Sequence, residues 1–265
     1  MARLPQAVGG HVPRRRFGQN FLVDRSVIDR IVAAVAPAPD DWLVEIGPGQ
    51  GALTGPLLER VPHLDAVEID RDLAGELAVR FTPERLTVHV ADALRFDFAS
   101  VGDALRIVGN LPYNISSPLL FRLTDCIGSI RDCHFMLQRE VVERMAAPPG
   151  DKTYGRLSVM LQYWYSIERL FRVAPGAFRP APKVDSAVVR MTPHRPLPWV
   201  ARDYTTFSAI VAQAFSHRRK TLRNCLRDAV PEAAFEAACI DPSLRPEVLP
   251  VADFVRLADA AVALR

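Results

Sequence analysis

Cysteine and histidine are scarce in this sequence, and neither forms a recognisable ligand pattern. The four cysteines are not spaced as C-x-x-C pairs, and the six histidines include no H-E-x-x-H motif. Zinc sites and disulfide frameworks depend on such spacings. We therefore expect no bound metal, and we expect reduced, buried thiols in a reducing cytoplasm at Cys126, Cys133, Cys225 and Cys239.

Long hydrophobic runs are also absent. The longest apolar segments have the length of a strand, so no transmembrane helix is expected. The N-terminal segment contains Arg14 to Arg16 with no apolar stretch after them, which argues against a secretory or twin-arginine signal. The composition, with 49% hydrophobic and 24% charged residues, is that of a globular protein with a full core. We expect a cytoplasmic monomer that does not bind a membrane.

Lysine is nearly missing: the chain has 30 arginines and 3 lysines, with a formal net charge of +3. The planar guanidinium group suits phosphate recognition, although a GC-rich genome produces the same bias. Placement says more than number, because five basic residues lie within residues 216–227, among them Arg218, Arg219, Lys220 and Arg223. Such a run is commonly a solvated helix face, and contact with phosphates is the alternative.

Short apolar runs alternate with amphipathic segments from residue 42 to about 140. The runs predict strands at residues 42–47, 65–70, 86–91, 104–109 and 133–138. Strand and helix in this alternation predict an α/β fold, with a parallel Rossmann-like sheet covered on both faces. The nearly continuous apolar strands agree with a sheet that is buried on both sides.

The pattern changes after residue 150. It predicts a helix at 156–168, two strands of an antiparallel edge at 170–173 and 186–191, and then helices at 207–215, 220–230, 233–238 and 251–264. Three prolines in residues 192–199 indicate a linker. The predicted organisation is a Rossmann-like domain at 1–192 with an N-terminal extension at 1–16, a proline-rich linker at 193–199, and a small α-helical domain at 200–265.

The first two expected strands end in residues typical of a nucleotide site. Gly47 and Gly49 allow a tight turn and a close approach of ligand to backbone, and Glu68 lies where a carboxylate can bind both ribose hydroxyls. These residues also satisfy the dinucleotide fingerprint, with Ala52 as its last position. On these features alone, an NAD-dependent dehydrogenase and a methyltransferase fit equally well.

The next two strands favour an adenosyl ligand. Asp92 follows the third strand, where its carboxylate can accept from the amine of an adenine, although a helix cap is the competing interpretation. Asn110 ends the fourth strand. Because the carboxyl ends of parallel strands meet at one edge of the sheet, we expect Gly47, Glu68, Asp92 and Asn110 to line one groove.

The segment Asn110-Leu111-Pro112-Tyr113 suits methyl transfer from S-adenosylmethionine to the exocyclic amine of a base. The Asn110 side-chain oxygen and the Leu111 carbonyl, whose direction Pro112 restricts, can accept the two N–H groups of the amine. Tyr113 offers a face on which a flipped base can stack. The main catalytic task would be positioning. The competing interpretation is a helix-entry turn.

Taken together, the motifs resemble the bacterial 16S rRNA adenine N6,N6-dimethyltransferases, the KsgA/RsmA family, over nearly the whole chain. The resemblance rests on six motifs in order, namely FGQNFL (17–22), EIGPGQG (45–51), EID (68–70), NLPYNISS (110–117), QREV (138–141) and FRPAPKVDS (178–186). It implies S-adenosylmethionine as cofactor and dimethylation of two adjacent adenines near the 3′ end of 16S rRNA. The immature 30S subunit is the implied partner.

The resemblance also implies a role for each site residue. Asn20 and Leu22 would contact the methionine part of the cofactor, Gly47 and Gly49 would lie beneath it, and Glu68, Asp92 and Asn110 would contact the ribose, the adenine and the region of the methyl group. The target adenine would lie between Tyr113 and Phe178, and the basic run would contact phosphates.

Two other functions stay open at this point. The first is a non-catalytic factor for assembly of the small subunit, and the second is a 23S rRNA adenine methyltransferase of the macrolide-resistance type. The Leu111 form of the motif and the continuation to Leu119 look more like the 16S group.

Overall fold

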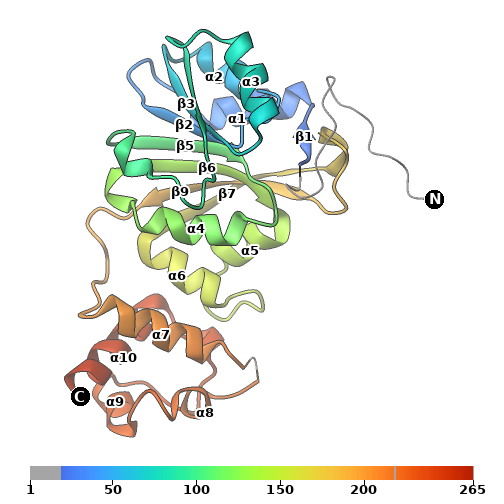
Figure 1. The fold of residues 1–265 in the computed structure, drawn as a ribbon. Helices are drawn as coiled ribbons and strands as arrows, with labels where there is room; N and C mark the ends of the chain where they lie inside the picture. The colour runs from blue at the N-terminus through green and yellow to red at the C-terminus, as the bar shows by residue number, and fades with distance from the viewer. Residues whose placement is uncertain (1–18, 218, 265) are drawn as a thin grey trace. The chain divides into compact units, whose positions relative to one another are not determined.

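The computed structural model describes residues 19–217 and 219–264. They form two compact units (Figure 1). Unit 1 contains the described residues up to Val142 together with Glu168–Pro193, and unit 2 contains Glu143–Ile167 together with the chain from His194 onward. Unit 2 thus includes the segment 143–167, which the sequence analysis assigned to the first domain. Within the described ranges no helix is long and apolar enough to cross a membrane, and no cluster of three metal-binding side chains occurs.

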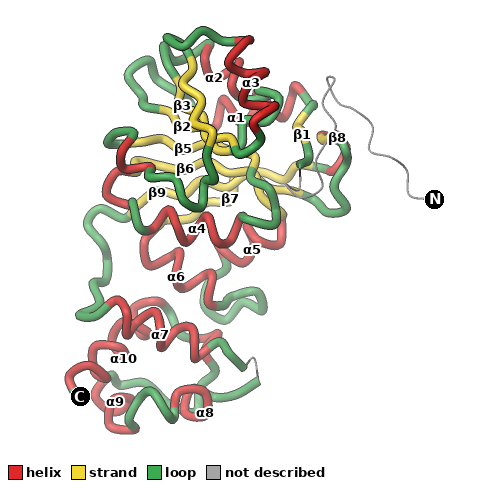
Figure 2. The backbone as a smooth tube through the Cα atoms, in the orientation of Figure 1, coloured by secondary structure: helices red, strands yellow, loops and turns green. Residues whose placement is uncertain are grey.

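A seven-stranded sheet forms the centre of unit 1, in the order β4-β3-β2-β5-β6-β9-β7 (Figure 2). Its strands are β2 (Leu43–Ile46), β3 (Leu64–Glu68), β4 (Leu86–Val90), β5 (Leu105–Asn110), β6 (Ile130–Gln138), β7 (Tyr165–Val173) and β9 (Ser186–Pro193). The first five are parallel, and β9 runs antiparallel to β6. The predicted parallel sheet with an antiparallel edge is confirmed.

The strand order creates a switch point at the centre of the sheet. The chain leaves β2 for β3 and β4 on one side and then returns to β5 on the other side of β2. The register places the ends of neighbouring strands nearly level, with Ile46 opposite Val67 and Glu68 opposite Val90. In open α/β sheets, ligands bind at the carboxyl edge beside such a point.

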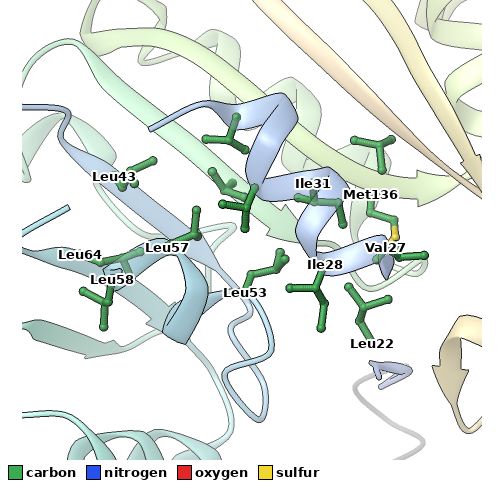
Figure 3. Packing of buried hydrophobic residues seen from close by; sticks show 14 of the residues in the cluster. Leu22, Val27, Ile28, Ile31, Leu43, Leu53, Leu57, Leu58, Leu64 and Met136 are labelled. Carbon is green, nitrogen blue, oxygen red and sulfur yellow. The ribbon is translucent and has the colours of Figure 1, made fainter. Parts of the chain in front are cut away.

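The main core of unit 1 lies between the sheet and two helices, α1 (Arg25–Val35) and α2 (Thr54–Leu58). Helix α1 begins at Asp24, whose carboxylate accepts from two backbone N–H groups, and its buried residues recur every three or four positions. Figure 3 shows these side chains packed with those of α2 against residues of β2 and β3. The remaining helices of unit 1 are α3 (Arg71–Arg80), α4 (Ser116–Thr124) and the start of α5 (Arg139–Ala146).

A second, two-stranded sheet joins distant parts of unit 1. Strand β1 (Phe21–Leu22) pairs antiparallel with β8 (Phe178–Arg179), with Leu22 opposite Phe178. Neither strand is predicted from the sequence, because each has only two residues and no periodicity can be read from it. The pairing brings the first of the six motifs against the last.

Unit 2 is built from helices. They are α6 (Arg156–Trp164), α7 (Tyr204–Ala214), α8 (Leu222–Leu226), α9 (Glu232–Ala237) and α10 (Val251–Ala263). Four of its aromatic rings pack together, and each has its centroid within 6 Å of the centroids of two others. They are the rings of Tyr163, Trp164, Tyr204 and Phe207. The predicted helix 156–168 is too long, because the chain becomes strand β7 at Tyr165. The predicted helix 220–230 is also too long, because α8 covers only five of those residues.

Candidate active site

A cavity of about 320 Å³ opens at the carboxyl edge of the sheet in unit 1. Five segments supply most of its lining: residues 19–22 around β1, 45–50 and 52–53 at the end of β2 and beyond it, 67–69 at the end of β3, 91–94 after β4, and 110–115 at the end of β5 and beyond it. Leu73 also lines it. Every residue predicted to bind the cofactor is in this lining. The structure therefore brings together the strand ends that the sequence predicted to meet.

The turn after β2 requires glycine. Gly47 and Gly49 have φ angles of +65° and +56°, in the region that residues with a Cβ rarely occupy. A Cβ on Gly49 would also lie 3.2 Å from the ring of Phe21. The backbone of this turn consequently forms the floor of the cavity, where a ligand can approach it closely.

Glu68 is held rigidly at the end of β3. Its side chain accepts hydrogen bonds from the backbone N–H groups of Gly49, at 3.1 Å, and Asp70, at 2.8 Å. Glu68 is buried, and burial raises the pKa of its carboxyl group. Each oxygen keeps lone-pair capacity for a further donor, such as a ribose hydroxyl.

Asp92 begins a turn after β4, rather than a helix, and it lines the cavity. Its Oδ1 accepts from the backbone N–H of Leu94 at 3.0 Å, as in a turn that begins with aspartate. Its Oδ2 has no hydrogen-bond partner within the described ranges and remains available. The helix-cap interpretation of Asp92 is wrong, because the next helical segment begins only at Phe98.

Asn110 has a defined orientation at the end of β5. Its Nδ2 donates to the backbone carbonyl of Asn20 at 2.9 Å, so the amide nitrogen is occupied and Oδ1 is left as an acceptor. The backbone N–H of Leu111 donates to Met136 at 3.1 Å, which ties the following residue to β6. The arrangement presents an acceptor at the cavity wall, as the proposed chemistry of this motif needs.

Tyr113 lies at the cavity wall and is half-buried. Its hydroxyl is 2.7 Å from the hydroxyl of Ser186. Burial raises the pKa of Tyr113, which keeps the phenol neutral. Pro112 also lines the cavity, next to the Leu111 carbonyl.

Phe178 does not reach this cavity. Its side chain is fully buried in the hydrophobic core with Leu22 and Val173. Phe178 is not among the residues that line the cavity, and the sandwich of a base between Tyr113 and Phe178 stays a prediction.

One residue of the cavity wall was not singled out from the sequence. Glu45 is 2% exposed, and its Oε2 accepts a hydrogen bond of 2.6 Å from Thr54. Burial raises the pKa of Glu45 to about 7, and the neighbouring Glu68 adds to the effect. A carboxylate in the middle of the apolar run LVEI was the available signal.

Of the basic run of unit 2, Arg219 and Lys220 lie between α7 and α8, and Arg223 lies in α8. Arg218 falls outside the described residues. Arg219 and Lys220 are exposed, with no ion-pair partner within the described ranges, whereas Arg223 is paired with Glu232. Two of the four predicted RNA contacts therefore present uncompensated charge.

Comparison with known proteins adds independent information. The family model described as ribosomal RNA adenine dimethylase matches residues 10–262. The chain is 58% identical, over 247 residues, to ribosomal RNA small subunit methyltransferase A of Aromatoleum aromaticum, covering 93% of each chain. It is 57% identical, over 251 residues, to the protein of the same name from Laribacter hongkongensis, covering 94% of this chain and 96% of the relative.

Two solved structures resemble the chain over most of its length. A dimethyladenosine transferase from Plasmodium falciparum has a TM-score of 0.78 and 25% identity, covering 89% of this chain and 95% of its own. The 23S rRNA methyltransferase ErmE has a TM-score of 0.71 and 26% identity, covering 92% of this chain and 100% of its own.

Proposed function

The chain belongs to the ribosomal RNA adenine dimethylase family, and from this premise we propose that it methylates N6 of two adjacent adenines near the 3′ end of 16S rRNA. The product is N6,N6-dimethyladenine. The observation that carries the proposal is 57–58% identity, across 93–94% of the chain, to relatives named as small-subunit methyltransferases. The 23S alternative has weaker support, because identity to ErmE is only 26%.

The lining of the cavity fits S-adenosylmethionine, the cofactor of this reaction. Its volume lies within the range of small-ligand sites. Carboxylates line it, and no lysine or arginine does so within the described ranges, which suits a ligand that carries positive charge on sulfur and nitrogen. We assign the ribose to Glu68, the adenine to Asp92, and the methionine end to Asn20, Leu22, Gly47 and Gly49.

The acceptor nitrogen needs orientation more than activation. When bound, S-adenosylmethionine supplies a methyl group on a positively charged sulfur that leaves readily. The lone pair of the adenine amine is delocalised into the ring, so Asn110 Oδ1 and the Leu111 carbonyl accept its N–H groups and direct the lone pair toward the methyl position. The amine becomes positively charged as it attacks and then loses its proton easily, so no strong general base is required. Positioning of this kind can supply several kcal/mol.

Tyr113 completes the base site. A base that reacts at N6 must leave its stack, and an aromatic face replaces part of the lost stacking energy. The ring lies beside Pro112 in the wall of the same cavity as Asn110. We therefore assign stacking on one face of the base to Tyr113, whereas Phe178 is buried and does not line the cavity in this conformation.

We assign contact with the RNA backbone to the α-helical region after residue 200. Arg219 and Lys220, with the adjacent Arg218, would contact phosphates and position the chain without reading sequence. The immature 30S subunit in the cytoplasm is the proposed partner, and a monomer is the proposed form. A second role in small-subunit assembly is compatible with an intact methylation site.

The test uses 30S particles that lack these methyl groups. They are incubated with the purified protein and labelled S-adenosylmethionine, and modified bases are mapped by mass spectrometry. We expect two adjacent dimethylated adenines near the 3′ end of 16S rRNA. Label on 50S particles instead would favour the 23S activity, and binding to 30S without label would favour a purely non-catalytic assembly factor. The Asn110→Ala protein serves as the catalytic control.

A further inference from the structure

Tyr113 stands on a short turn that needs support from elsewhere. It belongs to the five residues between β5 and α4, and its backbone carbonyl accepts from Ser116 Oγ at 3.1 Å. That bond restrains the main chain of the turn but leaves the side-chain torsions free. The far end of the ring is restrained separately, by the bond of 2.7 Å between the Tyr113 and Ser186 hydroxyls.

Ser186 is a rigid anchor for that bond. It is 0% exposed and is the first residue of β9, where it lies opposite Gln138 of β6. Its hydroxyl has no other hydrogen-bond partner within the described ranges, so the Tyr113 contact satisfies a group that would otherwise be buried without one. Buried hydroxyl groups left in that state are costly, which makes the contact persistent.

Ser186 also ends the motif that contains Phe178. Since Phe178 does not line the cavity, its motif approaches the base site through Ser186, which contacts Tyr113 in the cavity wall. We infer that Ser186 is a positioning residue for methyl transfer: its hydroxyl holds the Tyr113 ring, at the end opposite the backbone, in the orientation that stacks on the flipped adenine. The inference rests on the proposed function.

The physical basis is preorganisation. A tyrosine ring held at both its Cβ and its hydroxyl has lost most of its torsional freedom before the base arrives, so stacking costs less ordering entropy. Small misplacements of a reacting group reduce rates strongly because transfer needs alignment with the methyl. The Tyr113 hydroxyl thus contributes through Ser186 and takes no part in proton transfer.

The test is a double-mutant cycle of Ser186→Ala, Tyr113→Phe and the combination, measured as single-turnover transfer to 30S particles lacking the methyl groups. Each single change removes the same hydrogen bond and should lower the rate roughly two- to tenfold, the range for one neutral hydrogen bond. The double change should lower it no further than the slower single variant. The KM for S-adenosylmethionine should stay unchanged while kcat falls, which would show that the cofactor site of the variant is intact.

Ser158→Ala provides the matched control. Ser158 is also 0% exposed, and its hydroxyl donates to the Arg144 carbonyl in unit 2. Its loss should lower the free energy of unfolding without changing the transfer rate. If Ser186→Ala fails to fold, Tyr113→Phe still removes the hydrogen bond between the two hydroxyls. The single-turnover transfer rate of Tyr113→Phe then tests the inference.

The possible failures are distinguishable. A parent protein that transfers no methyl group to the particles overturns the proposed function and this inference with it. An active parent with multiplicative effects in the cycle, or with Tyr113→Phe far slower than Ser186→Ala, overturns only the inference, because the tyrosine hydroxyl would then act independently of Ser186. A Ser186→Ala protein that transfers methyl groups as fast as the parent also overturns only the inference.

Discussion

The buried carboxyl group of Glu45 should make the stability of the protein depend on pH between about 4.5 and 7. The ordinary pKa of a glutamate is 4.5, and burial in the cavity wall raises that of Glu45 to about 7. Below 4.5 both the folded and the unfolded chain hold the proton. Between 4.5 and 7 the unfolded chain releases it while the folded chain retains it, so the unfolded state binds fewer protons and stability falls as pH rises. Above 7 the loss is complete.

The size of the effect follows from the shift. One pKa unit corresponds to roughly 1.4 kcal/mol, so a shift from 4.5 to about 7 is worth roughly 3 kcal/mol in total. About a quarter of that has already been lost at pH 5 by the same relation, which leaves about 2–3 kcal/mol between pH 5 and pH 8. Glu45→Gln removes the titration but keeps an oxygen that can accept from Thr54.

Urea unfolding at pH 5 and pH 8, followed by circular dichroism, measures the difference between variant and parent at each pH. Carboxyl groups that do not interact with Glu45 titrate alike in both proteins and cancel. The free energy of unfolding of Glu45→Gln relative to the parent should rise by about 2–3 kcal/mol from pH 5 to pH 8. A relative stability that is the same at both values would refute a buried, proton-retaining Glu45.

Three further predictions concern binding and transfer. Asn110→Ala should reduce single-turnover methyl transfer by a factor on the order of 100–1,000, because deletion of an oriented polar group at a reacting centre has an effect of this size. The circular dichroism spectrum should not change. Transfer within tenfold of the parent would contradict the role of Asn110. Glu68→Ala should weaken S-adenosylmethionine binding by about 1.5–3 kcal/mol in calorimetry, and unchanged affinity would remove it from the ribose site. Alanine at residues 218–220 should reduce the salt dependence of rRNA binding by a slope of about 0.7–0.9 per phosphate contact, whereas Arg256→Ala, which alters an arginine already paired with an aspartate, should not.

The sheet was predictable because its strands carry their own signal. Strands β2, β3 and β5 are short, mainly apolar runs of mostly buried residues, and such a run can be recognised in the sequence alone. The edge strand β4 is only partly buried. The predicted helix at 156–168 is too long, and this error shows what a prediction from local sequence pattern cannot detect. Tyr165 and the residues after it become a strand because β9 is available as a neighbour, and that neighbour lies some twenty residues further along the chain.

The cofactor side of the site was predictable for a related reason. Gly47, Glu68, Asp92 and Asn110 each follow a strand, and parallel strands in register deliver their ends to one edge. Glu45 was passed over because strand position alone does not say which face of the sheet a side chain occupies. Its burial, and the proton that burial retains, depend on α2 bringing Thr54 against it.

The base side depends on contacts that no local pattern contains. Phe178 and Ser186 belong to one motif, and the sequence offered the aromatic residue as the natural partner for a base. In this structure β8 pairs with β1, and the ring of Phe178 is buried in the hydrophobic core that also contains Leu22. The residue that reaches Tyr113 is instead the serine at the start of β9, 73 positions away in sequence. A phenylalanine at position 113 would keep the stacking face and lose this tether, so the hydroxyl of Tyr113 has a structural reason to be present that the chemistry of methyl transfer alone does not require.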